Sequence, residues 1–207
     1  MIKKLLTTSA AVLALFILTS TLSAQSVKLE SGDLGFLKGG TTLNVEFVYD
    51  GLTVGKLTEQ AYIDKRVSEA NAKQAGTGDQ WLVKWKADRT EHFEPKFAEL
   101  MNKQFTDRKT TLKLDRDPAA KYTLVLKTTN LDPGYNIGIM RAPASVSTTA
   151  EFYDTKDRSK TLAVVNILKA PGRDGMGYDF DAGYRLQEGY AKTGKELGNL
   201  ICKKVAN

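Results

Sequence analysis

The chain has 207 residues, a formal net charge of +6, one cysteine and one histidine. A single cysteine excludes an intramolecular disulfide, and one cysteine with one histidine supply too few ligands for a zinc site of the usual His/Cys type. Charges of both signs are interspersed without a long basic block, which argues against the concentrated basic stripe of a nucleic-acid-binding protein.

Residues 1–24 have the pattern of a cleaved signal peptide. Two lysines are followed by the apolar run Ala10–Leu18, and Leu22–Ala24 approximates a small-x-small cleavage site. The run is too short for a membrane anchor, because a spanning helix needs about 20 apolar residues. No cysteine lies near the cleavage site, so a bacterial lipoprotein is not expected. We predict export to the periplasm or the exterior, with residues 25–207 as one domain that has no transmembrane segment.

The first strand patterns precede any helical pattern. Val27–Glu30 alternates like a short strand, and Thr42–Tyr49 alternates more clearly. An Asp50-Gly51 turn closes the second strand. One face of this strand is expected to be buried, because it carries the apolar side chains Leu43, Val45, Phe47 and Tyr49.

Helical patterns fill the next sixty residues. Thr58 fits the N-cap of a helix that ends at Gly76, and Asp79 fits the cap of a second helix. Pro95 lacks a backbone N–H and clashes with the preceding turn inside a helix. The sequence therefore predicts a break near Thr90–Glu94 and a further helix from about Pro95.

The richest strand territory follows. A short strand is predicted at Thr110–Leu114, and longer ones at Tyr122–Thr129, Val146–Tyr153 and Thr161–Leu168, where β-branched and aromatic residues dominate. Turn residues and short connections separate the last three. Antiparallel pairing is the simplest assembly for such neighbours.

A long helix over about Ala182–Val205 is predicted to close the fold. Glycine in a helix costs about 1 kcal/mol relative to alanine, so small residues in a row suggest close approach of another backbone, here expected to be the sheet. These observations predict an α+β fold: an antiparallel-dominated sheet of about five strands, two to four helices packed mainly on one face, and the closing C-terminal helix. The helix has an apolar stripe of Leu186, Tyr190, Leu197 and Ile201 beside a small-residue row of Ala191, Gly194, Gly198 and Cys202.

The glycine-rich loop Ala170–Gly183 is the candidate binding segment. Long loops inside a compact domain are often functional. Its aromatic and arginine side chains are types used in protein recognition, and its aspartates could bind calcium, pair as an acid and base, or cap the closing helix. The candidate binding residues are Arg173, Asp174, Tyr178, Asp179 and Asp181.

Signals for catalysis are few. His92 is the sole histidine, and the sequence holds no G-x-S-x-G motif, no P-loop and no G-x-G-x-x-G after a strand. The aspartate spacing in the loop departs from the twelve-residue calcium loop. We predict no catalytic residue, no metal ion and no cofactor.

The element order and the helix ending Gly194–Lys204 resemble a group of uncharacterised exported bacterial envelope proteins. The chain is similar to the small α/β domain in the N-terminal part of the Tol-Pal propeller protein and in curli-secretion and transport-auxiliary lipoproteins. The resemblance covers about residues 110–205 and implies a scaffolding or assembly role in the cell envelope. The lipobox of many such relatives is absent here, which puts outer-membrane anchoring in doubt.

The leading hypothesis is a non-enzymatic exported protein that binds a protein or envelope component through a sheet edge or through the 170–183 loop. Two alternatives stay open. A hydrolase or carbohydrate-active enzyme would use the loop carboxylates and needs a concave pocket beside them. A carrier of a small apolar ligand would need a cavity under Trp81, Trp85 and Phe93.

Overall fold

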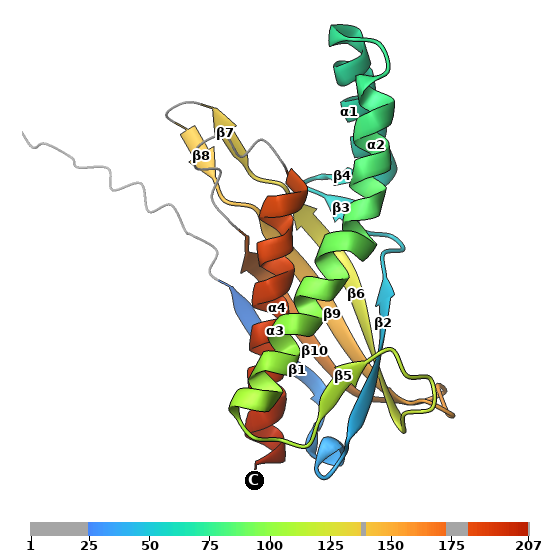
Figure 1. Ribbon diagram of the computed structural model, residues 1–207, viewed down its shortest axis with the longest axis vertical. Helices are drawn as coiled ribbons and strands as arrows, with labels where there is room; N and C mark the ends of the chain where they lie inside the picture. The colour runs from blue at the N-terminus through green and yellow to red at the C-terminus, as the bar shows by residue number, and fades with distance from the viewer. Residues whose placement is uncertain (1–24, 138–139, 173–181, 207) are drawn as a thin grey trace, which may run out of the picture.

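A mixed β-sheet runs through the protein, and the long helices α3 and α4 lie across one of its faces (Figure 1). The structure is a computed structural model that describes residues 25–137, 140–172 and 182–206. The helical segments are η1 (Gly35–Leu37), α1 (Glu59–Lys73), α2 (Thr77–Asp88), η2 (Arg89–Phe93), α3 (Glu94–Asp107) and α4 (Ala182–Val205). The strands are β1 (Ser26–Gly32), β2 (Thr42–Val48), β3 (Thr53–Val54), β4 (Leu57–Thr58), β5 (Lys113–Asp115), β6 (Tyr122–Asp132), β7 (Tyr135–Ile137), β8 (Met140–Ala142), β9 (Ser145–Asp154) and β10 (Thr161–Pro171).

The α+β class and the closing helix are confirmed, but the expected five-stranded antiparallel sheet is wrong. Within the described ranges the sheet has eight strands in the order β1-β10-β9-β6-β2-β5, with β3 and β4 joined beside β6. The part from β1 to β6 is antiparallel. In contrast, β2 pairs in parallel with both β6 and β5. The helices between β2 and β5 form a long crossover, which returns the chain to the same end of the sheet and makes the strands parallel.

The predicted burial of the apolar face of β2 is confirmed, although Asn44 on the opposite face is buried as well. Leu43 and Val45 are buried, and the ring of Phe47 meets the ring of Phe97 on α3 edge to face at 5.6 Å. After the turn that follows β6, strands β7 and β8 form a separate two-stranded hairpin. The core therefore lies between the helix-facing side of the sheet and the pair α3 and α4.

The helix changes where a break was predicted, near Thr90–Glu94, and α3 begins at Glu94, but the chain stays helical throughout. The chain passes from α2 to α3 through the π-helical turn η2, and the N–H of Glu94 donates to the carbonyl of Arg89, five residues earlier. Pro95 then sits in the first turn of α3, where a missing N–H costs little. The wider turn thus absorbs the proline without ending the helix. If α2, η2 and α3 are counted as one continuous helix, the described chain has three long helices. The other two are α1 and α4.

Helices α3 and α4 run in the same direction and approach closely at glycines. A Cβ placed on Gly194 would lie 2.2 Å from the carbonyl oxygen of Phe97. Cys202 is buried, and its thiol lies 3.7 Å from the carbonyl oxygen of Gln104. Burial raises the pKa of this thiol. The sequence predicted that the small residues of α4 would pack against the sheet. At Gly194 the neighbour is instead the backbone of α3. Gly189 does pack against the sheet, where it meets the side chain of Val146.

Helices α1 and α2 form a hairpin that extends past the end of the sheet (Figure 1). Its base carries a cluster of aromatic rings, in which Trp81 and Trp85 stack at 5.5 Å and Tyr62 lies 5.3 Å from Trp85. Trp85 is 3% exposed. Among the described residues no helix is both long and apolar enough to cross a membrane.

Replacing Thr58 by alanine is expected to lower the free energy of unfolding by about 1 kcal/mol. The Thr58 side chain accepts a hydrogen bond from the N–H of Ala61 at 3.2 Å, which confirms the predicted N-cap of α1. Denaturant unfolding measures the change. Ser68→Ala, at an exposed position of the same helix, is the control and is expected to change stability by less than about 0.5 kcal/mol. Equal effects of the two substitutions would contradict the capping role.

Candidate functional site

The outermost strand row of the sheet is interrupted beside β2. Strands β2 and β3 lie one after the other along the same side of β6. On their outer side, β5 pairs with Thr42–Asn44 and β4 pairs with Thr53–Val54. Between these two stretches, no described strand pairs with the outer side of Val45–Val48, which we call the open edge of β2.

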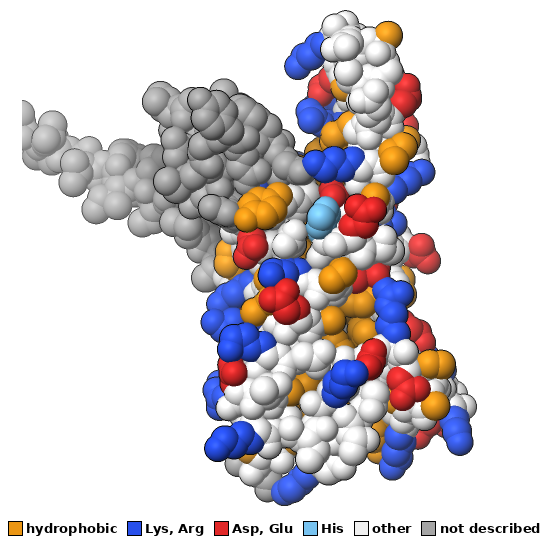
Figure 2. Space-filling model, in the orientation of Figure 1, with side chains coloured by type: hydrophobic (Ala, Val, Ile, Leu, Met, Phe, Trp, Pro, Cys, Tyr) orange, Lys and Arg blue, Asp and Glu red, His pale blue; other side chains and the backbone are white. Residues whose placement is uncertain are grey.

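A groove runs between this edge and the helices above it. Two overlapping cavities of about 270 and 450 Å³ make up the groove. In Figure 2, hydrophobic side chains show among charged ones over this part of the molecule. We call it the β2 groove; its floor is Asn44, Val45, Glu46 and Phe47 of β2, its helical wall is Thr90, Glu94, Pro95 and Ala98, and its end is Arg116 and Pro118.

The one carboxylate in the helical wall, that of Glu94, is compensated. Glu94 is 7% exposed, accepts a hydrogen bond from the hydroxyl of Tyr49 at 3.2 Å, and forms an ion pair with Arg116. The Arg116 side chain is 66% exposed, and its guanidinium lies 5.8 Å from the ring centroid of Phe47. The protein itself therefore supplies both a hydrogen-bond donor and an opposite charge for this carboxylate. The helical wall of the groove is therefore electrically neutral as it stands.

Buried hydroxyl groups connect the groove to the core. The hydroxyl of Tyr190 lies 2.7 Å from the hydroxyl oxygen of Thr128, and it also interacts with Tyr49. The ring of Phe93 stacks on Tyr190 with centroids 4.7 Å apart. Burial raises the pKa of both Tyr49 and Tyr190 well above the ordinary tyrosine value. These contacts join η2, β6 and α4 to Tyr49, which directly follows β2 beside the groove.

A second set of contacts lies at the base of the α1–α2 hairpin, close to the groove. The carboxylate of Glu59 accepts hydrogen bonds from the indole of Trp85 at 2.8 Å and from the guanidinium of Arg89 at 2.5 Å. That guanidinium also lies 4.4 Å from the ring centroid of Tyr49. The α1–α2 hairpin is thereby tied to β2 beside the groove.

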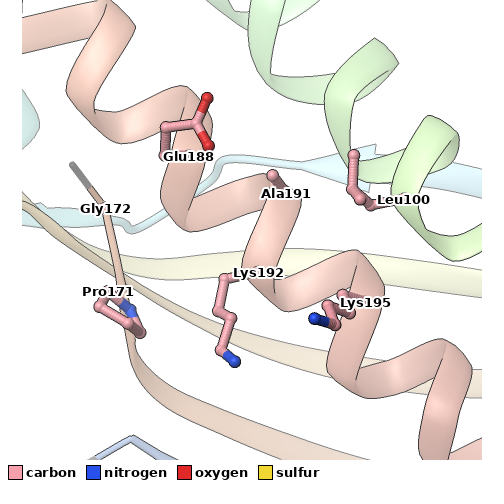
Figure 3. A pocket seen from close by; sticks show the side chains of 7 residues that line it. All are labelled: Leu100, Pro171, Gly172, Glu188, Ala191, Lys192 and Lys195. Carbon is pink, nitrogen blue, oxygen red and sulfur yellow. The ribbon is translucent and has the colours of Figure 1, made fainter.

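A further cavity of about 520 Å³ lies beside α4. Figure 3 shows Leu100 reaching it from α3, with Pro171 and Gly172 at the end of β10 on the other side. Lys192 pairs with Glu196 on its own helix at 2.7 Å, and Lys195 is exposed. Ion pairs of exposed lysines contribute little binding energy, because water and salt screen the charges. We therefore take the β2 groove as the better candidate.

The five residues proposed from sequence lie outside the described residues: Arg173, Asp174, Tyr178, Asp179 and Asp181. The same holds for residues 1–24 and the signal-peptide prediction. At the start of α4, the carboxylate of Asp88 lies against Gly183, where an added Cβ would be 2.0 Å from Oδ2. A negative charge in the first turn of a helix is favourable. Sequence reasoning considered only loop aspartates for this place and missed Asp88.

His92, the sole histidine, lies beside Asp88. Nε2 of His92 is 3.7 Å from Oδ1 of Asp88, and the imidazole is 44% exposed. The described residues contain no group of three or more histidine, cysteine, aspartate and glutamate side chains that could hold a metal ion.

Sequence reasoning also missed Glu94 and Arg116. They are 22 residues apart and meet only because β5 returns the chain to β2. The available signal was the alternation of β2, which placed Val45 and Phe47 on one face. Nothing in that pattern shows that β2 lies near an edge.

No family model and no curated protein matches the chain. Among solved structures, the PelC dodecamer from Paraburkholderia phytofirmans is similar at 12% identity and a TM-score of 0.36, covering 84% of this chain and 98% of PelC. A variant of the same protein in another crystal form gives 12% identity and a TM-score of 0.35, covering 82% and 96%. A likeness at this level supports no conclusion about function.

Proposed function

We propose that this chain is an exported, non-enzymatic binding protein that contacts a protein component of the cell envelope through the β2 groove. The observation that carries the proposal is the groove itself. It has apolar residues in its floor beside an open strand edge, and the carboxylate in its wall, Glu94, is paired with Arg116. Apolar surface next to fixed polar groups is typical of recognition sites.

Export and an envelope role rest on the sequence. The lysine-led apolar segment in residues 1–24 supports export, and the resemblance of residues 110–205 to envelope proteins supports an assembly role. The groove adds a place for the partner.

Site-specific photocrosslinking in the producing cells tests the proposal. A photoreactive phenylalanine analogue at Thr90, exposed in the helical wall, is expected to give one defined adduct in the envelope fraction. The same analogue at Lys127, exposed on the other face of the sheet, is expected to give none of that adduct. The two positions differ in their relation to the groove and not in exposure.

A groove-blocking variant sharpens the result. Ala98→Glu puts a charged side chain into the helical wall, and Lys103→Glu puts the same side chain at an exposed position of the same helix. The Thr90 adduct should disappear with the first substitution and persist with the second. An adduct that survives Ala98→Glu would show that the partner contacts another surface.

A further inference from the structure

We propose that the β2 groove takes up an extended segment of the partner protein as an additional strand, which fills the gap between β4 and β5 in the outer row of the sheet. This inference rests on the proposed function and specifies the form in which the partner binds. Figure 1 shows β4 and β5 near the two ends of β2, with the middle of β2 between them.

The main chain of the open edge offers hydrogen-bonding groups to such a guest. In a strand, every second residue turns its N–H and C=O groups away from a given neighbour. Over Val45–Val48, β6 takes the groups on one side, and no described backbone group pairs with those on the other. Unpaired edge groups are a template for another strand, and the stretch of four residues spans about 13 Å.

The two edges of the sheet differ in how they are protected. The other edge strand, β1, carries the ion pair Lys28–Glu30 and an irregular register between Leu29 and Ser31, features that discourage strand addition. The open edge of β2 reads Val-Glu-Phe-Val and contains neither proline nor glycine. Its one acid, Glu46, lines the larger of the two cavities, and its carboxylate accepts two hydrogen bonds of 2.7 and 3.1 Å from Arg158. No charge on β2 itself therefore opposes a guest strand without being compensated.

The groove also selects the guest's side chains. A strand beside β2 places every second side chain on the helix-facing side of the sheet. There these side chains would meet Val45 and Phe47 of the floor and Pro95 and Ala98 of the wall. Because Glu94 is already paired with Arg116 and Tyr49, a charged guest residue there would lose water without gaining a partner. The guest is thus an extended peptide segment with uncharged, apolar residues at every second position.

Peptide selection followed by backbone methylation tests the inference. Random twelve-residue peptides displayed on phage are selected on the full chain and counter-selected on the Ala98→Glu variant. The selected peptide is then synthesised with one backbone nitrogen methylated at a time. Methylation of every second backbone nitrogen is expected to weaken binding by about tenfold, because each of these nitrogens donates a main-chain hydrogen bond to β2. Methylation of the nitrogens in between should have little effect.

The possible outcomes separate the inference from the proposed function. Groove-dependent peptides whose binding ignores backbone methylation, or follows a helical spacing, would overturn strand addition while leaving the groove as a binding site. Failure to select any peptide that Ala98→Glu excludes would count against the proposed function as well. Sedimentation of the chain alone completes the test: a dimer that Ala98→Glu dissociates would make a second copy the occupant, and the proposal of a partner segment would be wrong.

Discussion

Replacing Gly194 by alanine is expected to lower the free energy of unfolding by about 2 kcal/mol. The new methyl group would lie 2.2 Å from the carbonyl oxygen of Phe97, and all three nearest atoms belong to the α3 backbone. A backbone atom cannot rotate away as a side chain does, so the two helices must separate. Alanine's better helix propensity offsets about 1 kcal/mol of the strain, and the figure of 2 is what remains.

Gly198→Ala is the matched control in the same helix. Its nearest neighbours are Cβ and Cγ of Gln104 at 3.0 and 3.2 Å, with the carbonyl oxygen of Met101 at 3.2 Å. Small shifts relieve these contacts. The gain from alanine's higher helix propensity and the remaining steric strain of the new methyl group should therefore nearly cancel. Denaturant unfolding and thermal melting measure both variants, and the Gly194 variant should melt roughly 4–8 °C lower. Equal losses would mean that α3 and α4 can slide apart freely.

The Gly194 contact also bears on the groove. Phe97 lies on α3 between the wall residues Pro95 and Ala98, and its ring meets Phe47 of the floor. Moving α3 away from α4 would therefore change the distance between wall and floor. A glycine in the closing helix thus sets the width of a groove formed by other elements.

Local patterns in the sequence predicted much of the fold. The β-branched runs identified β6, β9 and β10, and the helical stripe predicted Ala182–Val205, the bounds that α4 has. Such patterns report which residues are buried and with what period. They do not report which strands become neighbours. The parallel pairing of β2 depends on where the helical crossover returns the chain, which no period reveals.

Pro95 shows the same limit at the scale of one helix turn. The rule that proline cannot donate to the helical ladder is correct, and the ladder is indeed altered just before it. Whether a helix ends or widens there depends on its surroundings. Phe93 and Phe97 are both buried, so continuing the helix through a π turn keeps both rings in the core.

The candidate site could be predicted least. Composition drew attention to Asp174, Asp179 and Asp181, because glycine and aspartate mark loops. An open strand edge has no composition of its own, because it arises when β4 and β5 each cover one part of the outer row and leave Val45–Val48. The sheet edge was named in advance only as a general possibility.

Replacing Tyr190 by phenylalanine is expected to cost about 1–3 kcal/mol of stability. The ring can keep its stacking on Phe93, so the change removes only a hydroxyl. That hydroxyl is the partner of Thr128, which is 1% exposed. A buried hydroxyl without a partner has lost its hydrogen bonds to water and forms none within the protein. Denaturant unfolding of the variant measures the loss.

A double-mutant cycle shows whether the two hydroxyls act as a pair. Thr128→Val alone should also destabilise, but Tyr190→Phe with Thr128→Val should cost less than the sum, with a coupling of about 1 kcal/mol. Thr148→Val is the control: Thr148 lies opposite Thr128 in β9, is fully buried, and its hydroxyl has no hydrogen-bond partner among the described residues. Its replacement should be neutral or stabilising, because it removes an unsatisfied group.

Additive losses would contradict the pairing. They would mean that each hydroxyl finds another partner, and the connection from Thr128 through Tyr190 to Tyr49 would then not hold the groove floor in place. A clear coupling would support that connection, because Tyr49 links the same hydroxyls to Glu94 in the wall. In that case Tyr190→Phe should also weaken peptide binding at the β2 groove, although Tyr190 lies in the core and does not line the groove.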